Sequence, residues 1–320
     1  MPQSINRTLC LLFAALALCV ISRAADTQPA KSPTTSSAGM RLLPNLEYAD
    51  VDGKSLLLDL YLPDPTDKPA PVILYVHGGA WSGGDKHDRT AVALVAHGYA
   101  VASIDYRLSQ EAIFPAQIED CKTAVRWLRA HARFYGLDGA HIGAWGSSAG
   151  GHLVALLGTT GGVADLEGPA GNLDQSSRVQ AVCDWFGPTD FLKFAEQAKE
   201  AGIAGQPDSP KSPMSRLIGG PIQENKDKTE KANPIAYVNK DCPPFLIMHG
   251  ANDPLVPVAQ SEILRDALEK AGVEVKLEVI PGAGHGLGGR AVLASVEAFF
   301  DKHLKAANPA PATRPAVGTP

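Results

Sequence analysis

The chain has 320 residues, of which 45% are hydrophobic and 20% are charged, and its formal net charge at pH 7 is -5. This composition is that of an ordinary globular protein with enough apolar residues for one large core, and it excludes a low-complexity or disordered chain. The acidic balance and the lack of any long basic run argue against a nucleic-acid-binding protein.

The first 24 residues have the features of a secretory signal peptide. Arg7 supplies a positive charge, and residues 9–21 form an apolar run that is short for a membrane span. The small residues Ser22 and Ala24 suit a cleavage site. An uncleaved anchor is the alternative. We therefore expect a secreted or periplasmic protein with no stable membrane insertion after cleavage.

Segments rich in proline, serine, threonine and alanine flank the central part of the chain. Residues 25–40 are predicted to be a disordered linker and residues 306–320 a disordered tail, which leaves 41–305 as one folded domain. The cysteines of this domain are Cys121, Cys183 and Cys242. They allow at most one disulfide and lack the spacing of a metal site, so buried free thiols are the favoured interpretation.

Strand and helix patterns alternate along this domain. Residues 47–51 and 55–61 predict an antiparallel opening pair of strands. Further strands are predicted at residues 72–76, 100–104, 141–145, 179–185, 245–248 and 273–280. Helices are predicted at residues 91–97, 115–134, 149–157, 258–270 and 290–304. This alternation predicts an α/β fold with a mostly parallel central sheet and helices on both faces.

Two stretches interrupt the alternation. Residues 159–178 read as a glycine-rich loop, and residues 187–239 are predicted to form irregular helices and loops that cap the site. Parallel strands bring their carboxyl ends to one edge of a sheet. The loops that follow Val76, Trp145, Met248 and Ile280 should therefore converge on one place.

The segment Gly146–Gly150 has the pattern G-x-S-x-G, with Ser148 in the middle. A serine hydroxyl is a weak nucleophile unless it is exposed beside a base, and a sharp turn between a strand and a helix holds it so. The predicted strand before the motif and the predicted helix after it provide that context. Ser147 is the rival nucleophile, but the turn points the middle residue into the site, and a non-catalytic glycine-rich turn is the other alternative.

A second motif, His77–Trp81, follows the strand at residues 72–76. Its glycines, Gly78 and Gly79, can turn backbone amides toward one point and so form an oxyanion hole. The amide of Ala149, directly after Ser148, should be the partner donor. A phosphate-binding loop is less favoured, because no G-x-G-x-x-G or G-K-[ST] pattern follows.

The base and the acid must come from loops later in the chain. His285, after the strand at residues 273–280, is predicted to be the base, and Asp253 is predicted to orient it. His249 is assigned a supporting role. Asp184 and Asp190 are the alternative acids.

Four motifs together resemble the α/β hydrolases, in the branch that holds the hormone-sensitive-lipase-like and the bacterial feruloyl-esterase-like (BD-FAE) enzymes: His77–Trp81, Asp105–Arg107, Gly146–Gly150 and Gly284–His285. The resemblance implies an α/β-hydrolase fold and an esterase that works through an acyl-enzyme without a cofactor or metal. Ala80 stands where lipase-like members often carry a third glycine, which favours the feruloyl- or acetyl-esterase-like side.

The resemblance suggests a small-molecule or carbohydrate ester as the substrate, such as acetylated or feruloylated plant polysaccharide. The modest size of the predicted cap favours a short acyl group. Trp81, Trp185 and Phe186 either line the substrate pocket or belong to the core. An amidase, formamidase or peptidase of the same fold, or a ligand-binding protein without activity, are the alternative functions. The sequence leaves the oligomeric state open.

Overall fold

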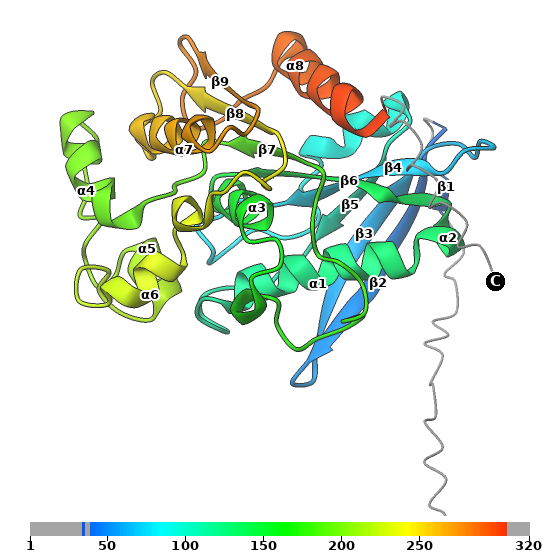
Figure 1. Cartoon of the computed structure of the whole chain (residues 1–320), viewed down its shortest axis with the longest axis horizontal. Helices are drawn as coiled ribbons and strands as arrows, with labels where there is room; N and C mark the ends of the chain where they lie inside the picture. The colour runs from blue at the N-terminus through cyan, green and yellow to red at the C-terminus, as the bar shows by residue number, and fades with distance from the viewer. Residues whose placement is uncertain (1–33, 36–38, 306–320) are drawn as a thin grey trace, which may run out of the picture. The chain divides into compact units, whose positions relative to one another are not determined.

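The computed structural model describes residues 34–35 and 39–305, and these residues contain one mixed sheet of nine strands in the order β1-β2-β3-β5-β4-β6-β7-β8-β9 (Figure 1). The strands are β1 Thr34–Thr35, β2 Arg41–Val51, β3 Lys54–Leu62, β4 Ala70–Val76, β5 Ala100–Ile104, β6 Leu137–Ser147, β7 Ala181–Trp185, β8 Phe245–Gly250 and β9 Val275–Ile280. From β5 to β9 every neighbouring pair is parallel, while β1, β2 and β3 form an antiparallel extension beside β5.

Helices and short helical turns connect the strands. They are η1 Thr90–His97, α1 Ala116–Ala130, α2 Ala132–Tyr135, α3 Ala149–Thr159, η2 Ala164–Leu166, α4 Phe191–Glu200, α5 Pro213–Ile218, α6 Lys226–Lys231, η3 Pro234–Tyr237, α7 Ala259–Lys270, α8 Arg290–Phe300 and the π-helical turn η4 Asp301–Lys305. The predicted α/β-hydrolase architecture, with a mostly parallel sheet, is confirmed.

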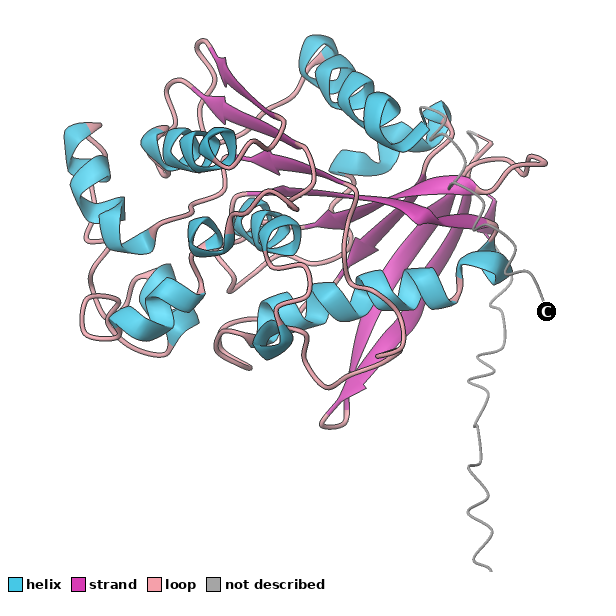
Figure 2. Ribbon diagram, in the orientation of Figure 1, coloured by secondary structure: helices cyan, strands magenta, loops and turns pink. Residues whose placement is uncertain are grey.

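The residues of β4 show why helices cover both faces of the sheet. Side chains alternate between faces along a strand, and all seven residues of β4 are apolar apart from the tyrosine hydroxyl. Val72, Leu74 and Val76 pack in the core beneath α1, α3 and α7, whereas Ile73 and Tyr75 pack with η1 and α8 on the opposite face. Figure 2 shows these two helical layers on either side of the magenta sheet. A central parallel strand buried on both faces therefore reads as a continuous apolar run.

The insertion between β7 and β8 forms the predicted cap of short helices and loops, from α4 to η3, beyond the carboxyl ends of the strands (Figure 1). Side-chain oxygens start two of its helices. Asp190 accepts hydrogen bonds from the amides of Leu192 and Lys193 at α4, and Ser212 accepts one from the amide of Ser215 at α5. The cap thus owes its short elements to local capping as well as to packing.

Some boundaries differ from the prediction. Within the segment predicted as a linker, Thr34–Thr35 pairs with β2 and Met40 is buried. The helix predicted at residues 115–134 is split at His131 into α1 and α2, and Cys242 is half-buried rather than buried. The three thiols are free, as predicted. The predicted signal peptide and tail lie outside the described residues.

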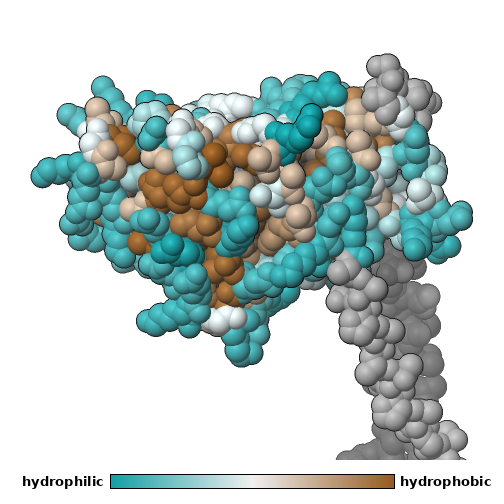
Figure 3. Space-filling view, turned by 90° about the horizontal axis from the view of Figure 1, so that it is seen from above, coloured by the Kyte–Doolittle hydropathy of each residue, from teal (hydrophilic) through white to brown (hydrophobic). Residues whose placement is uncertain are grey.

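The described part of the chain contains no helix that is both long and apolar enough to cross a membrane. Seen from above, its surface is mostly hydrophilic but carries a continuous area of hydrophobic residues, drawn in brown (Figure 3). Among residues 39–305, the exposed large apolar side chains are Ile113, Phe134, Leu173, Leu255 and Val279. Of these, Leu255 lies beside the candidate site.

Candidate active site

Ser148 occupies the sharp turn between β6 and α3, as the motif predicts. Its backbone has φ 55° and ψ -119°, a conformation that is unfavourable for a residue with a side chain. The amide of Ser148 donates to the carbonyl of Trp185 at 2.8 Å, which ties the turn to the end of β7. The last position of the motif, Gly150, must be a glycine because a Cβ there would lie 2.0 Å from the carbonyl oxygen of Val76.

Three side chains from separate loops form a hydrogen-bonded chain at this turn. Ser148 Oγ lies 3.0 Å from His285 Nε2, and His285 Nδ1 lies 2.7 Å from Asp253 Oδ2. An ionised carboxylate only accepts hydrogen bonds, so Nδ1 carries the ring hydrogen and Nε2 is free to accept the serine proton. The other oxygen, Asp253 Oδ1, accepts from the amides of Leu255 and Val256 at 2.8 and 3.0 Å.

The environment of Asp253 keeps it ionised. Burial by itself would raise the pKa of Asp253, but hydrogen bonds from His249, His285 and the two amides outweigh burial and hold the pKa well below its usual value. His249 is fully buried, and its ring contacts Ser261 Oγ, the carbonyl of Val256 and the Asp253 carboxylate. The supporting role predicted for His249 is therefore visible in its contacts.

The alternative acids lie elsewhere. Asp184 accepts a hydrogen bond from the amide of Gly187, and Asp190 caps α4. Ser147, the rival nucleophile, has its hydroxyl 3.4 Å from the hydroxyl of Tyr75. The structure thus brings together Ser148, His285 and Asp253 and leaves the alternatives apart from them.

The loop after β4 lies directly against the serine turn. Gly79, Ala80 and Trp81 all have positive φ, at 107°, 52° and 55°. A Cβ at Gly78 would lie 3.0 Å from the carbonyl of Ser147 and 3.4 Å from Cβ of Ser148, so the glycine permits this approach. The amides of Gly78 and Gly79 donate to no acceptor among the described residues.

The amide of Ala149 lies at the start of α3, where the helix itself supplies no acceptor. All three predicted oxyanion donors therefore belong to segments that meet at Ser148. An arrangement of free amides around a nucleophile can stabilise a negative oxygen that develops in a transition state.

Tyr106, to which the sequence analysis assigned no role, packs against the loop after β4. Tyr106 stacks on the ring of His77 at 4.3 Å between centroids, and its hydroxyl donates to the carbonyl of His77 at 3.1 Å. The ring of His77 in turn contacts the carbonyl of Gly78 through Nδ1 at 2.7 Å, and burial lowers the pKa of His77. Tyr106 lies in the Asp105–Arg107 motif, which was the available signal.

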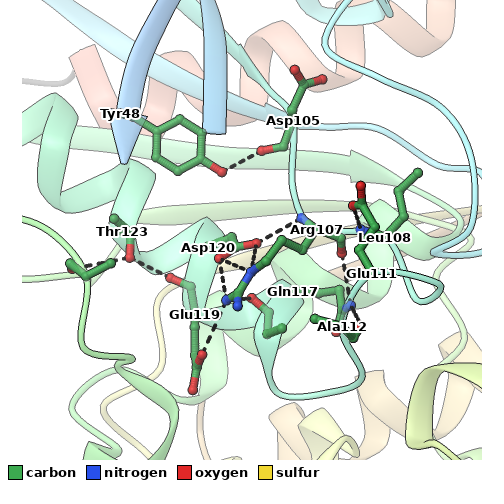
Figure 4. A network of polar contacts seen from close by, with 12 residues as sticks. Tyr48, Asp105, Arg107, Leu108, Glu111, Ala112, Gln117, Glu119, Asp120 and Thr123 are labelled. Carbon is green, nitrogen blue, oxygen red and sulfur yellow. Dashed lines mark hydrogen bonds and ion pairs between the residues drawn. The ribbon is translucent and has the colours of Figure 1, made fainter. Parts of the chain in front are cut away.

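A polar network fixes the segment around Tyr106 (Figure 4). Arg107 donates to Asp120 from Nε at 2.9 Å, from Nη2 at 2.7 Å and from its backbone amide at 2.8 Å. The hydroxyl of Tyr48 donates to the carbonyl of Asp105 at 2.5 Å. Burial raises the pKa of Asp120 even though Arg107 opposes it, so desolvation is the larger effect at this carboxylate.

Two cavities meet at Ser148. The first is a cleft of about 680 Å³ beside the loop after β4, and the second is a chamber of about 310 Å³ beneath the cap. Both are lined by Ala80, Ser148, Leu255 and His285. A substrate bound across Ser148 would therefore place one part in each cavity.

The three aromatic residues that the sequence singled out lie at these cavities. Trp185 and Phe186 line the cleft and Trp81 lines the cap chamber, although each is less than 5% exposed. The ring of Phe186 packs on His285 at 4.6 Å between centroids. Their position combines the two interpretations, since each packs in the core and also borders a cavity. No group of three or more histidine, cysteine or acidic residues suited to a metal ion occurs in the described ranges.

Comparisons with known proteins agree with this fold. The BD-FAE family model matches residues 58–268. Esterase LipC of Mycobacterium tuberculosis is 33% identical over 245 residues, which are 73% of this chain and 58% of LipC. The chain spans about half the length of the curated relatives it matches.

Solved structures of esterases are also similar. A truncated carbohydrate esterase from gut microbiota is 36% identical with a TM-score of 0.73, and the match covers 82% of this chain and 95% of that one. Esterase Est2 of Thermogutta terrifontis with bound propionate is 26% identical with a TM-score of 0.64, over 83% of this chain and 92% of that one.

Proposed function

Because the chain belongs to the BD-FAE family, we propose that it is a serine carboxylesterase that hydrolyses esters through an acyl-enzyme. The observation that carries this proposal is the hydrogen-bonded chain from Ser148 through His285 to Asp253, set beside the free amides of the loop after β4. The esterase names of its relatives support the same reaction class.

In the first half of the proposed reaction, His285 Nε2 takes the proton of Ser148 while Oγ attacks the ester carbonyl carbon. The resulting tetrahedral oxyanion is stabilised by the amides of Gly78, Gly79 and Ala149, where one such donor is typically worth about 3 kcal/mol of barrier. Asp253 stabilises the imidazolium. The C–O bond to the alcohol then breaks, and the alcohol leaves with the proton from Nε2.

In the second half, a water molecule gives a proton to His285 and adds to the acyl carbon. The second tetrahedral species collapses, Ser148 Oγ regains its proton from His285, and the free acid departs. The loop amides act on both oxyanions. No step needs a cofactor.

Esters of carbohydrates with short acyl groups are the proposed substrates. Two observations support this: the solved relative from gut microbiota is named a carbohydrate esterase, and the Thermogutta enzyme was solved with propionate. The cap chamber of about 310 Å³ also limits the size of any group that enters it. Secretion or export to the periplasm remains a proposal from the N-terminal sequence.

The test replaces Ser148 with alanine and measures hydrolysis of p-nitrophenyl esters from acetate to decanoate, beside acetylated xylan and methyl ferulate. Ser148→Ala should lower turnover by roughly 10⁴-fold or more. The wild-type protein should be labelled by a fluorophosphonate at residue 148, and Ser147→Ala should still be labelled. Near-normal turnover by Ser148→Ala would refute the mechanism, and faster turnover of decanoate than of acetate would refute the proposed chain length.

A further inference from the structure

The two cavities beside Ser148 differ in chemistry, and the difference bears on which part of an ester each can hold. The cleft contains polar side chains on the segment that follows the oxyanion loop, including Asp85, Asp88 and Thr90. The cap chamber is bordered mainly by apolar residues such as Trp81, Phe194 and Met214. Hydroxyl groups lose free energy when they are buried without hydrogen-bond partners, so they favour the cleft and an apolar acyl group favours the chamber.

Proton transfer points the same way. The leaving alcohol must accept a proton from His285 Nε2, so it departs on the side where the histidine loop faces the substrate. The residues that follow the histidine, Gly286 and Leu287, line the cleft and not the cap chamber. Ala149, directly after Ser148, lines the cap chamber and not the cleft.

Several hydrogen bonds fix the carboxylate of Asp88 in the cleft. Its Oδ2 accepts from the hydroxyl of Tyr75 at 2.9 Å, and its Oδ1 accepts from the hydroxyl and amide of Thr90 at 2.7 and 3.0 Å. Burial raises the pKa of Tyr75, so that hydroxyl remains a donor. A carboxylate has about four acceptor positions, and these three contacts leave one for a further hydroxyl. Asp85, by contrast, is an exposed rim residue.

We propose that the cleft binds a polyhydroxylated alcohol, such as a sugar, that the cap chamber binds the acyl group, and that Asp88 is a specificity-determining residue that accepts a hydrogen bond from a hydroxyl of that alcohol. This inference rests on the proposed esterase function and adds the orientation of the substrate to it. Asp88 would thus contact the substrate in addition to stabilising the turn through Thr90.

The experiment compares two acetates of similar size that differ in the alcohol, a mono-acetylated methyl xyloside and cyclohexyl acetate. The quantity measured is kcat/KM for the xyloside acetate divided by kcat/KM for cyclohexyl acetate, both in the full-length protein. Asp88→Asn should reduce this ratio about tenfold. The amide of Thr90 donates to the Oδ1 position and so keeps the oxygen of the asparagine there, which leaves the nitrogen in place of Oδ2, where it cannot accept from the sugar hydroxyl. Thr90→Val, which removes the hydroxyl that orients Oδ1, should reduce the ratio in the same direction but less. Asp174→Asn changes an exposed carboxylate that lines neither cavity, so it should leave the ratio unchanged.

A reciprocal variant tests the cap chamber. Met214→Ala should shift the preference among acetyl, propionyl and butyryl esters of one alcohol, without changing the ratio between the two acetates. An equal loss on both acetates in Asp88→Asn and Thr90→Val would mean that the carboxylate is only structural. If Asp88→Asn altered acyl-length preference while Met214→Ala altered the alcohol ratio, the orientation would be reversed. Failure of the wild-type protein to hydrolyse any ester would instead overturn the proposed function itself.

Discussion

The close approach of α3 to the end of β4 is the contact on which the whole site depends, and Gly150→Ala tests it. The added Cβ would lie 2.0 Å from the carbonyl oxygen of Val76 and 2.7 Å from that of His77, whereas real Cβ contacts are essentially never shorter than 3.0 Å. Both neighbours are backbone atoms, so no side chain can rotate away. The strand end and the helix must therefore separate by about 1 Å.

That separation moves the loop after β4 relative to Ser148. Overpacking of this kind typically costs about 1–3 kcal/mol of stability. A displacement of about 1 Å between the nucleophile and the groups that serve it can cost about 100-fold in rate. Gly150→Ala should therefore lower kcat about 100-fold, because the oxyanion donors move away from Ser148. This loss comes in addition to the loss of stability.

The assay measures kcat for p-nitrophenyl acetate per active site, with the active sites counted by titration with a fluorophosphonate. The free energy of unfolding is measured in urea. The matched control is Gly288→Ala, where no atom lies within 4 Å of the added Cβ and φ is not positive. The control should retain wild-type values in both measurements. A Gly150→Ala protein that unfolds more easily but keeps its kcat per active site would show that the contact is only structural, and our account of the oxyanion loop would be wrong.

Two other predictions concern residues behind the site. Tyr106→Phe keeps the stacking on His77 but removes the hydroxyl that donates to the His77 carbonyl. It should lower the free energy of unfolding in urea by about 1–3 kcal/mol and lower kcat with little change in KM. A changed KM with an unchanged kcat would contradict a positioning role. Burial raises the pKa of Asp184 to about 6, so the folded state holds a proton that the unfolded state has lost between about pH 4 and 6, and stability from this group falls as pH rises through that window. Asp184→Asn removes this effect, so its stability relative to wild type should rise by up to roughly 3 kcal/mol from pH 4 to pH 7. Comparing the two proteins at each pH cancels the opposite contribution of His152, whose pKa burial lowers to about 4. A difference that does not vary with pH would refute the assignment.

The sequence predicted the sheet and the three-residue site because both depend on local patterns. The apolar run of β4, the turn at Ser148 and the loop that carries His285 each follow from a few adjacent residues. Parallel strands then bring the ends of those segments to one edge without further information. Burial of the strands on both faces follows from the same apolar runs.

The remaining features depend on contacts between residues distant in sequence. Tyr106 contacts His77 from 29 residues away. Both residues lie in motifs that the sequence shows, but neither motif indicates that the two rings stack. The sequence analysis assigned no role to Asp88, and only the structure shows that it lines a cleft and accepts a hydrogen bond from the hydroxyl of Tyr75 on β4. The division of the site into two cavities could not be predicted either, because it arises from the path of the cap.

The loop after β8 joins substrate contact to catalytic geometry in the proposed enzyme. Leu255 lines both cavities through a largely exposed side chain, and its backbone amide donates to Asp253 Oδ1. The side chain borders the cavities, whereas the amide donates to the Asp253 carboxylate. A change of side chain therefore alters the boundary between the alcohol and acyl positions while the amide still holds the carboxylate. A change of backbone conformation there would instead alter both at once. Specificity can therefore vary at this position only through side chains that accept the same backbone, which makes the loop a physical constraint on the esters that this site can accommodate.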